Sequence, residues 1–189
     1  ALRAQNIPTL FAMSVRDWVN ALLIEAGFKE CNHLVTLRLK PPLPKTEPIP
    51  NDLVIRQMTA RDLNAVLALD HAAFRPEWQL NKESLRETYQ LSANASVALL
   101  KGEMAGYQLS TLAFQTSHLG RLAVSPALQG HGIGKHLVLR ALQELEEIGA
   151  EDFSVNTQQD NPHSFRLYHS LGYQESEDTI PVFRKQLFP

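Results

Sequence analysis

The sequence contains very little cysteine, since Cys31 is the only one among 189 residues. An internal disulfide framework is therefore excluded, and a reducing, cytoplasmic setting is expected. No motif surrounds Cys31, so a catalytic thiol is not favoured there. Long apolar runs are also missing. No stretch approaches the roughly 20 apolar residues of a membrane-spanning helix, and Asn6 and Pro8 interrupt the short apolar run at the beginning, so no signal peptide or membrane partner is expected.

The chain also lacks an excess of charge of either sign. Its 18 Lys and Arg residues and 20 Asp and Glu residues give a formal net charge of −2. A strongly basic surface for nucleic acid is not predicted, and no metal site is expected. Hydrophobic residues make up 44% and charged residues 20%, which is typical of a folded globular protein of about one domain.

Proline is concentrated in one place, with five prolines between residues 41 and 50. Proline lacks an amide donor and favours extended backbone, so residues 41–52 are predicted to form a semi-rigid linker. The linker divides the chain into an N-terminal segment, residues 1–40, and a complete C-terminal domain, residues 53–189.

The C-terminal domain has alternating signals for strands and helices. Residue spacing and turn signals predict helices over 59–74, 82–91, 130–148 and 162–172. They predict strands over 53–59, 96–100, 103–114, 118–124, 152–157, 173–176 and 181–187. This order indicates a mixed α/β sheet with helices on its faces.

The N-terminal segment repeats the end of this pattern. Residues 7–13 and 33–39 are predicted strands, with a helix between them over residues 14–28. "WVNALLIEAGF…LVTLRL" resembles "SFRLYHSLGY…PVFRKQL", which suggests an internal repeat of half a domain, although units of this kind also resemble one another by chance. One helical face of the first copy carries apolar side chains at Val15, Trp18, Val19, Leu22 and Ala26. We expect no cofactor in this copy, and we expect its open strands to be covered by the main domain or by a partner chain, as in a homodimer.

A glycine-rich turn, "QGHGIGK", joins a predicted strand to the long helix of residues 130–148. The first amides of a helix lack partners, the helix dipole adds positive charge, and the glycines allow close approach, so a pyrophosphate is the expected ligand. The turn is not a Walker A motif, because Gln129 stands where the first glycine would be and His136 follows Lys135. It is not a dinucleotide fingerprint either, because its glycines alternate as Gly-x-Gly-x-Gly.

Two motifs together resemble the GNAT superfamily of N-acetyltransferases. Gln129, Gly132 and Gly134 match Gln/Arg-x-x-Gly-x-Gly/Ala, and "NTQQDNPHSFRLYHSLGY" matches the later Asn…Leu-Tyr-x-x-Leu-Gly-Phe/Tyr segment. The resemblance runs from about residue 53 to residue 187. It implies the α/β (α+β) acyltransferase fold, with a mixed, mostly antiparallel twisted sheet of about six to seven strands flanked by helices.

The resemblance implies that acetyl-CoA is bound and that its acetyl group passes to a primary amine by direct attack on the thioester. The strand residues that would meet the pantetheine arm are Leu122, Ala123 and Val124. The pyrophosphate would contact Gln129, Gly130, His131, Gly132, Ile133, Gly134 and Lys135. The later helix would contribute Asn161 and Ser164, with Arg166 as a further phosphate contact or an ordinary exposed charge. Tyr168 matches the family's tyrosine, which serves as the acid for the departing thiolate; a packing aromatic is the other interpretation.

The general base is open, because Gly120 stands where many family members have a glutamate. His118 is the nearest titratable group on that strand, and Glu77, His71, Glu103 or a water relay are alternatives. The loop of residues 74–80 would select the acceptor, a small-molecule or peptide amine, unless its aromatic residues only cap the core. A CoA-binding regulatory or scaffolding module with little turnover is the competing function.

Overall fold

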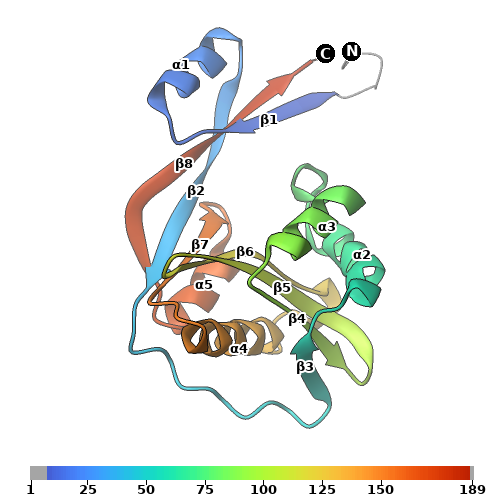
Figure 1. Cartoon of the computed structure of the whole chain (residues 1–189). Coiled ribbons are helices and arrows are strands. Elements are labelled where there is room, and N and C mark those ends of the chain that lie inside the picture. The colour runs from blue at the N-terminus through green and yellow to red at the C-terminus, as the bar shows by residue number, and fades with distance from the viewer. Residues whose placement is uncertain (1–7, 188–189) are drawn as a thin grey trace.

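The computed structural model describes residues 8–187, which form one eight-stranded sheet with helices on both faces (Figure 1). The strands are β1 (Thr9–Met13), β2 (Lys29–Leu39), β3 (Leu53–Gln57), β4 (Asn94–Leu100), β5 (Glu103–Ala113), β6 (Thr116–Val124), β7 (Asp152–Gln158) and β8 (Gln174–Gln186). The helices are α1 (Asp17–Glu25), α2 (Leu63–Ala73), α3 (Lys82–Leu91), α4 (Ile133–Glu147) and α5 (Pro162–Ser170). Three single 3-10 turns are η2 (Ala60–Asp62), η3 (Pro76–Trp78) and η4 (Pro126–Leu128).

The strand order in the sheet is β1-β8-β2-β7-β6-β5-β4-β3. Neighbouring strands are antiparallel except β6 and β7, which are parallel. The mixed, mostly antiparallel sheet expected from the sequence is confirmed. Separate strands at 173–176 and 181–187 were the wrong expectation, because residues 174–186 form the single long strand β8.

Each face of the sheet has its own hydrophobic core. The helices α4 and α5 cover β6, β7 and β2 on one face, where Leu37 of β2 is fully buried among residues of both helices. The helices α2 and α3 cover the other face over β4, β5 and β6, where Val66 and Leu85 pack against Tyr107. The two layers leave β6 in the middle of the molecule, with helices on both of its faces.

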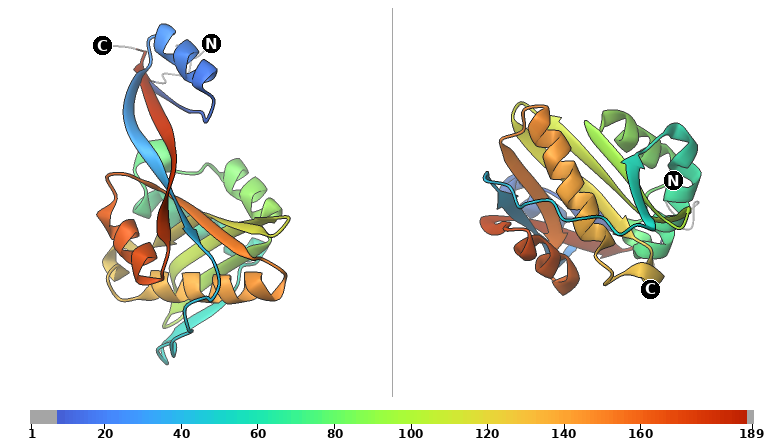
Figure 2. Two further views of the ribbon diagram at one scale, coloured as in Figure 1. Left: turned by 90° about the vertical axis from the view of Figure 1, so that its left-hand side faces the viewer. Right: turned by 90° about the horizontal axis from the view of Figure 1, so that it is seen from below.

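The N-terminal segment is joined to the main domain by an exchange of strands. Residues 34–39 of β2 lie between β7 and β8, so they complete the sheet of the C-terminal domain. Conversely, residues 182–186 of β8 pair with β1, and residues 29–32 of β2 flank the same part of β8. Between these ends β2 and β8 run as a twisted two-stranded ribbon, which holds β1 and α1 away from the main body (Figures 1 and 2).

The proline-rich linker follows the outer surface of α4 on its way from β2 to β3 (Figure 2). It is fixed there by an ion pair of 2.6 Å between Glu47 and Lys135, the third residue of α4. The hydrogen bond from Lys135 lowers the pKa of the Glu47 carboxyl below its usual range. The linker is therefore an ordered strap along this helix.

Within residues 8–187, no helix is both long enough and apolar enough to cross a bilayer. The same residues contain no cluster of three or more His, Cys, Asp and Glu side chains that could hold a metal ion.

Candidate functional site

The centre of the candidate site is the place where β6 and β7 separate. The two parallel strands pair only over residues 116–119 of β6 and 152–155 of β7. Beyond Leu119, β6 continues to Val124 while it pairs with β5 alone, and β7 continues to Gln158 while it pairs with β2. Backbone groups on the facing edges of both strands therefore have no ladder partner among the described residues. Such an edge can pair with an extended, amide-rich ligand as it would with another strand.

The sequence-predicted residues Leu122, Ala123 and Val124 all lie on this separated part of β6. Ala123 is buried against the α2 and α3 layer, whereas Leu122 and Val124 pack on the α4 side. Their side chains are thus used for the two cores. Leu122 and Val124 are only partly buried, and within residues 8–187 the backbone of this segment has a free edge where a ligand could pair.

The glycine-rich turn follows β6 and leads into α4. Gly130 and Gly132 both have a φ of +81°, the left-handed region that favours glycine. A Cβ atom at either position would meet nothing within 4 Å, so the space beside the turn is open. Gln129 donates a hydrogen bond of 3.3 Å from its side chain to the Val124 carbonyl and ties the turn to the end of β6. Exposed His131 contacts the Gln129 carbonyl through Nδ1 at 3.0 Å.

The start of α4 presents unpaired amides beside the separated strands. The first backbone bond into this helix is from the His136 N–H to the Gly132 carbonyl, at 3.1 Å. The amides of Ile133, Gly134 and Lys135 precede it and have no intrahelical acceptor. A Cβ at Gly134 would lie 3.5 Å from Val124 and 3.6 Å from Leu167, in ordinary van der Waals contact, so this part of the helix start packs against β6 and α5. Free amides and the positive helix-dipole charge together mean that the turn could hold an anion.

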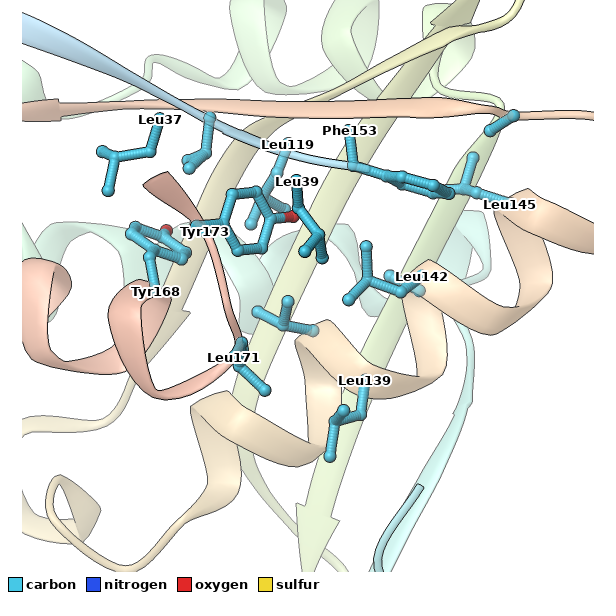
Figure 3. Packing of buried hydrophobic residues seen from close by; sticks show 14 residues of the cluster. Leu37, Leu39, Leu119, Leu139, Leu142, Leu145, Phe153, Tyr168, Leu171 and Tyr173 are labelled. Carbon is cyan, nitrogen blue, oxygen red and sulfur yellow. The ribbon is translucent and has the colours of Figure 1, made fainter. Parts of the chain in front are cut away.

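Tyr168 of α5 is buried with its ring against Tyr173, with 5.5 Å between the ring centroids (Figure 3). Burial raises the pKa of the Tyr168 phenol above its usual range, so the group stays protonated. Its hydroxyl makes no hydrogen bond with the described residues, and it is not one of their fully buried unpaired polar atoms. The phenol is thus a neutral donor at the boundary of the core.

His118 lies on β6 within the segment that is paired with β7. Its Nδ1 atom is 3.0 Å from the hydroxyl of Ser154, the residue opposite it on β7. Burial, and to a smaller degree the positive charge of Arg38, lowers the pKa of His118 below its usual range. The ring is therefore neutral near pH 7, and Nε2 makes no hydrogen bond with any residue from 8 to 187.

Three expected ligand contacts have protein partners instead. Lys135 pairs with Glu47 of the linker, as described above. Asn161 caps α5, since its Oδ1 accepts the Ser164 amide N–H at 3.1 Å. Arg166 donates to His163 at 2.9 Å and is exposed. The side-chain amide nitrogen of Asn161 and the hydroxyl of Ser164 have no other bond to the described residues.

The structure adds a buried polar network that sequence reasoning missed. The Asp70 carboxylate is fully buried and accepts hydrogen bonds from the Tyr107 hydroxyl, from Arg121 Nε at 2.8 Å and from the Leu80 amide at 2.9 Å. Burial, with the hydrogen bond to Asp70, raises the pKa of Tyr107. The only signal in the sequence was an acidic residue, Asp70, within the apolar stripe of its helix.

Arg121 connects this network to the loop of residues 74–80. It also donates to the Trp78 carbonyl at 2.6 Å and lies 3.7 Å above the centre of the Phe74 ring. The guanidinium therefore fixes the loop against β6, directly beside Gly120 and the unpaired edge. Phe74 and Trp78 are half-buried, and Phe74 packs against the core on this face of the sheet.

Of the other candidates for the general base, Glu77 and His71 lie at the loop of residues 74–80, and Glu103 lies at a distant hairpin. Glu77 is exposed in η3, and His71 Nε2 contacts the Leu80 carbonyl at 2.8 Å. Glu103 is exposed at the hairpin between β4 and β5.

Comparison with known families identifies the same region. The family model described as "Acetyltransferase (GNAT) family" matches residues 63–173, which include β6, the glycine-rich turn and α5. Among curated proteins, the chain is 25% identical over 140 residues to the "[Ribosomal protein bS18]-alanine N-acetyltransferase" of Escherichia coli, covering 71% of this chain and 86% of that protein. It is 26% identical over 175 residues to the "Mycothiol acetyltransferase" of Brachybacterium faecium, covering 82% and 53%.

Solved structures of similar fold fall into two groups by length. A GCN5-related N-acetyltransferase from Sphaerobacter thermophilus has a TM-score of 0.72 at 17% identity; the match covers 96% of this chain and 60% of that one. A tandem GNAT protein from the clavulanic acid biosynthesis pathway has a TM-score of 0.70 at 15% identity and coverages of 99% and 66%. The Escherichia coli ribosomal-protein-S18-alanine N-acetyltransferase has a TM-score of 0.62 at 18% identity and coverages of 72% and 95%. This chain thus spans about two thirds or less of the longer structures.

Proposed function

The chain belongs to the acetyltransferase (GNAT) family, and we propose that it transfers an acetyl group from acetyl-CoA to a primary amine at the junction of β6, β7 and α4. One observation carries the proposal. The unpaired edge of β6 beyond Leu119 leads directly into a turn whose glycines and helix-start amides form an open anion site. A ligand with an amide-rich arm and a pyrophosphate needs these two features side by side.

The residues present fit acetyl-CoA. The backbone of Leu122, Ala123 and Val124 would pair with the pantetheine arm, because their side chains are committed to the cores. The amides from Gly130 to Lys135 would hold the pyrophosphate, since nothing lies within 4 Å of a Cβ at Gly130 or Gly132. When bound, acetyl-CoA would supply an activated acetyl group as its thioester.

Two side chains at the start of α5 would contact the same ligand. The free amide nitrogen of Asn161 and the hydroxyl of Ser164 would contact the ligand without disturbing the α5 cap, which uses Asn161 Oδ1 and the Ser164 N–H. Lys135 would reach a phosphate only by exchanging or sharing its contact with Glu47. The backbone amides, rather than Lys135, would therefore provide most of the phosphate affinity.

Proton transfer would use two groups with opposite pKa shifts. Tyr168 would donate a proton to the departing thiolate, because burial keeps its phenol neutral and its hydroxyl has no competing acceptor in the described residues. His118 would accept a proton from the amine through water, because its lowered pKa keeps the ring neutral and leaves Nε2 free. The buried Asp70–Arg121 pair would hold the loop of residues 74–80, which would contact the acceptor.

The acceptor is proposed to be an amine on a small molecule or on a peptide. The two curated relatives described above are named as acetyltransferases of a ribosomal protein alanine and of mycothiol. They support acetyl transfer to an amine without selecting one acceptor. Another relative, the "Aminoalkylphosphonate N-acetyltransferase" of Salmonella typhimurium, is 28% identical over 137 residues.

A turnover assay separates this function from that of a CoA-binding module. Acetyl-CoA would be mixed with the chain and a panel of small amines and peptides, and release of free thiol would be followed. We expect amine-dependent thiol release for at least one class of acceptor. Clear binding of CoA by calorimetry, with no thiol release for any amine, would overturn the enzyme and favour the regulatory module.

A further inference from the structure

The N-terminal segment has an apolar stripe that its own structure leaves uncovered. Helical spacing places Trp18 and Leu22 on one face of α1, and Val15 lies two residues before the helix begins; the sequence pattern marks all three for burial. The side chains of Val15, Trp18 and Leu22 are 68%, 68% and 53% exposed, and no residue of α1 is buried. We refer to these three residues as the α1 stripe. Beside it, β1 is the last strand of the sheet and pairs on one side only, with β8.

The segment β1-α1-β2 matches β7-α5-β8 in local structure. Gly27 and Gly172 end the two helices with φ values of +84° and +87°, and an aromatic residue follows each glycine. The same capping bond recurs, from the Phe28 amide to Leu23 at 2.9 Å and from the Tyr173 amide to Tyr168 at 3.0 Å. The last strand of each unit also pairs with the first strand of the other, β8 with β1 and β2 with β7. Leu22 therefore stands where Leu167 stands, five residues before its glycine.

The matching places in the C-terminal unit are occupied. The strand β7 pairs with β2 on one side, and β6 pairs with it in parallel on the other side. Leu167 packs at the start of α4, where a Cβ on Gly134 would lie 3.6 Å from it. In the N-terminal unit no described residue takes the place of β6 or of α4, and Figure 2 shows β1 and α1 standing apart at the end of the β2-β8 ribbon.

The solved structures indicate what fills these places. The matches to the two longer structures cover at least 96% of this chain, so those structures include a counterpart of its N-terminal unit. The same matches cover only 60% and 66% of the longer chains themselves. The match to the Escherichia coli enzyme covers 95% of that enzyme but only 72% of this chain. In the two longer structures, the counterpart of the N-terminal unit is therefore found together with a long additional stretch of polypeptide.

We propose that the free side of β1 and the α1 stripe dock a strand and a helix arranged as β6 and α4 are, supplied by a further half-domain of the same fold within the same polypeptide. The incoming strand pairs parallel with β1, and the incoming helix covers Trp18 and Leu22. This proposal does not depend on the catalytic assignment. It explains why an open strand edge and a large apolar stripe occur together.

The test uses Trp18 as a reporter in the polypeptide made from the complete gene. Trp78→Phe, together with Phe at any tryptophan outside residues 1–189, leaves Trp18 as the only tryptophan. We expect a blue-shifted emission, iodide quenching several-fold weaker than that of free tryptophan, and slow hydrogen exchange of the β1 amides that do not pair with β8. Leu22→Glu, and the milder Leu22→Ser, should restore quenching. Leu91→Glu is the matched control, because Leu91 is 76% exposed on α3, and it should change nothing.

Two outcomes would overturn the proposal. Quenching of Trp18 as strong as that of free tryptophan, with fast exchange along β1, would mean that nothing covers the surface. A shielded Trp18 in a particle of twice the polypeptide mass by light scattering, which Leu22→Glu separates into halves, would mean that a second copy covers it instead.

Discussion

The two β-α-β units of this protein, β1-α1-β2 and β7-α5-β8, share their local structure. They differ in the elements that surround them and in the side chains that could form a binding site. Both helices end at a left-handed glycine followed by an aromatic residue, with the same capping bond. Yet Tyr168 of α5 lies in a core built with α4, whereas Leu23, at the same position of α1, is only half-buried and carries no phenol.

If the proposed function holds, one β-α-β unit alone would neither bind acetyl-CoA nor catalyse the transfer. The proposed anion site and the unpaired edge of β6 come from β6 and α4, whereas the unit β7-α5-β8 would contribute only the facing strand β7 and the Tyr168 phenol. The N-terminal unit contributes instead through packing, because its strand β2 is part of the other unit's core.

The largest effect is expected from breaking this shared strand. Leu37 of β2 is fully buried in the C-terminal core, so Leu37→Ala should lower the free energy of unfolding by about 3 kcal/mol through the cavity it leaves. Leu91→Ala, at a side chain of α3 that is 76% exposed, should cost less than about 1 kcal/mol. Urea denaturation followed by circular dichroism measures both. Equal costs for the two variants would show that β2 does not stabilise the C-terminal core.

The next effect concerns the phenol that only one unit has. Tyr168→Phe should reduce kcat about 100-fold while the Kd for acetyl-CoA stays the same, because the variant keeps the ring and loses the proton donor. Since burial raises the pKa of Tyr168, the wild-type rate should not fall from loss of this acid below about pH 10. Tyr173→Phe, in ring contact with it, is the matched control and should keep its turnover. An unchanged kcat in Tyr168→Phe would remove the assignment.

A smaller effect distinguishes two glycines of the same conformation. Gly132→Ala should weaken acetyl-CoA binding about 10-fold, because a left-handed alanine costs about 1–2 kcal/mol and shifts the start of α4. Gly27→Ala bears a similar strain at φ +84° in the N-terminal unit and should leave the affinity unchanged. Isothermal calorimetry gives both values. If both variants bound equally weakly, general destabilisation rather than the turn would be the cause.

The smallest effect is a change with pH. The folded state holds the pKa of His118 below that of the unfolded chain, so the unfolded state takes up the proton first as the pH falls. The free energy of unfolding should therefore decrease as pH falls below about 6.5, by less than about 1 kcal/mol, and this part of the slope should disappear in His118→Gln. Denaturant titrations at pH 5.5 and 7.5 measure it, and parallel profiles for the two proteins would contradict it.

Much of the site could be predicted from the sequence because its signals are local. Gly130 and Gly132 allow a turn that other residues resist, and the apolar spacing from Ile133 to Leu145 defines α4 without reference to any partner. The pairing of Arg121 with Asp70 could not be predicted, because 51 residues separate them and neither belongs to a motif. The pattern also marks Trp18 and Leu22 for burial, and the described chain leaves both exposed.

By itself the sequence determined the family, the glycine-rich turn and the order of helices and strands, since these depend on backbone preferences and on short-range spacing. Only the tertiary structure decided that β2 crosses into the C-terminal sheet, that β8 runs unbroken into the N-terminal unit, and that β6 and β7 separate after Leu119. The physical reason is that an isolated strand has no preference for a particular neighbour. Its place is fixed by the hydrogen bonds and apolar contacts that the whole sheet gains when each edge finds a partner.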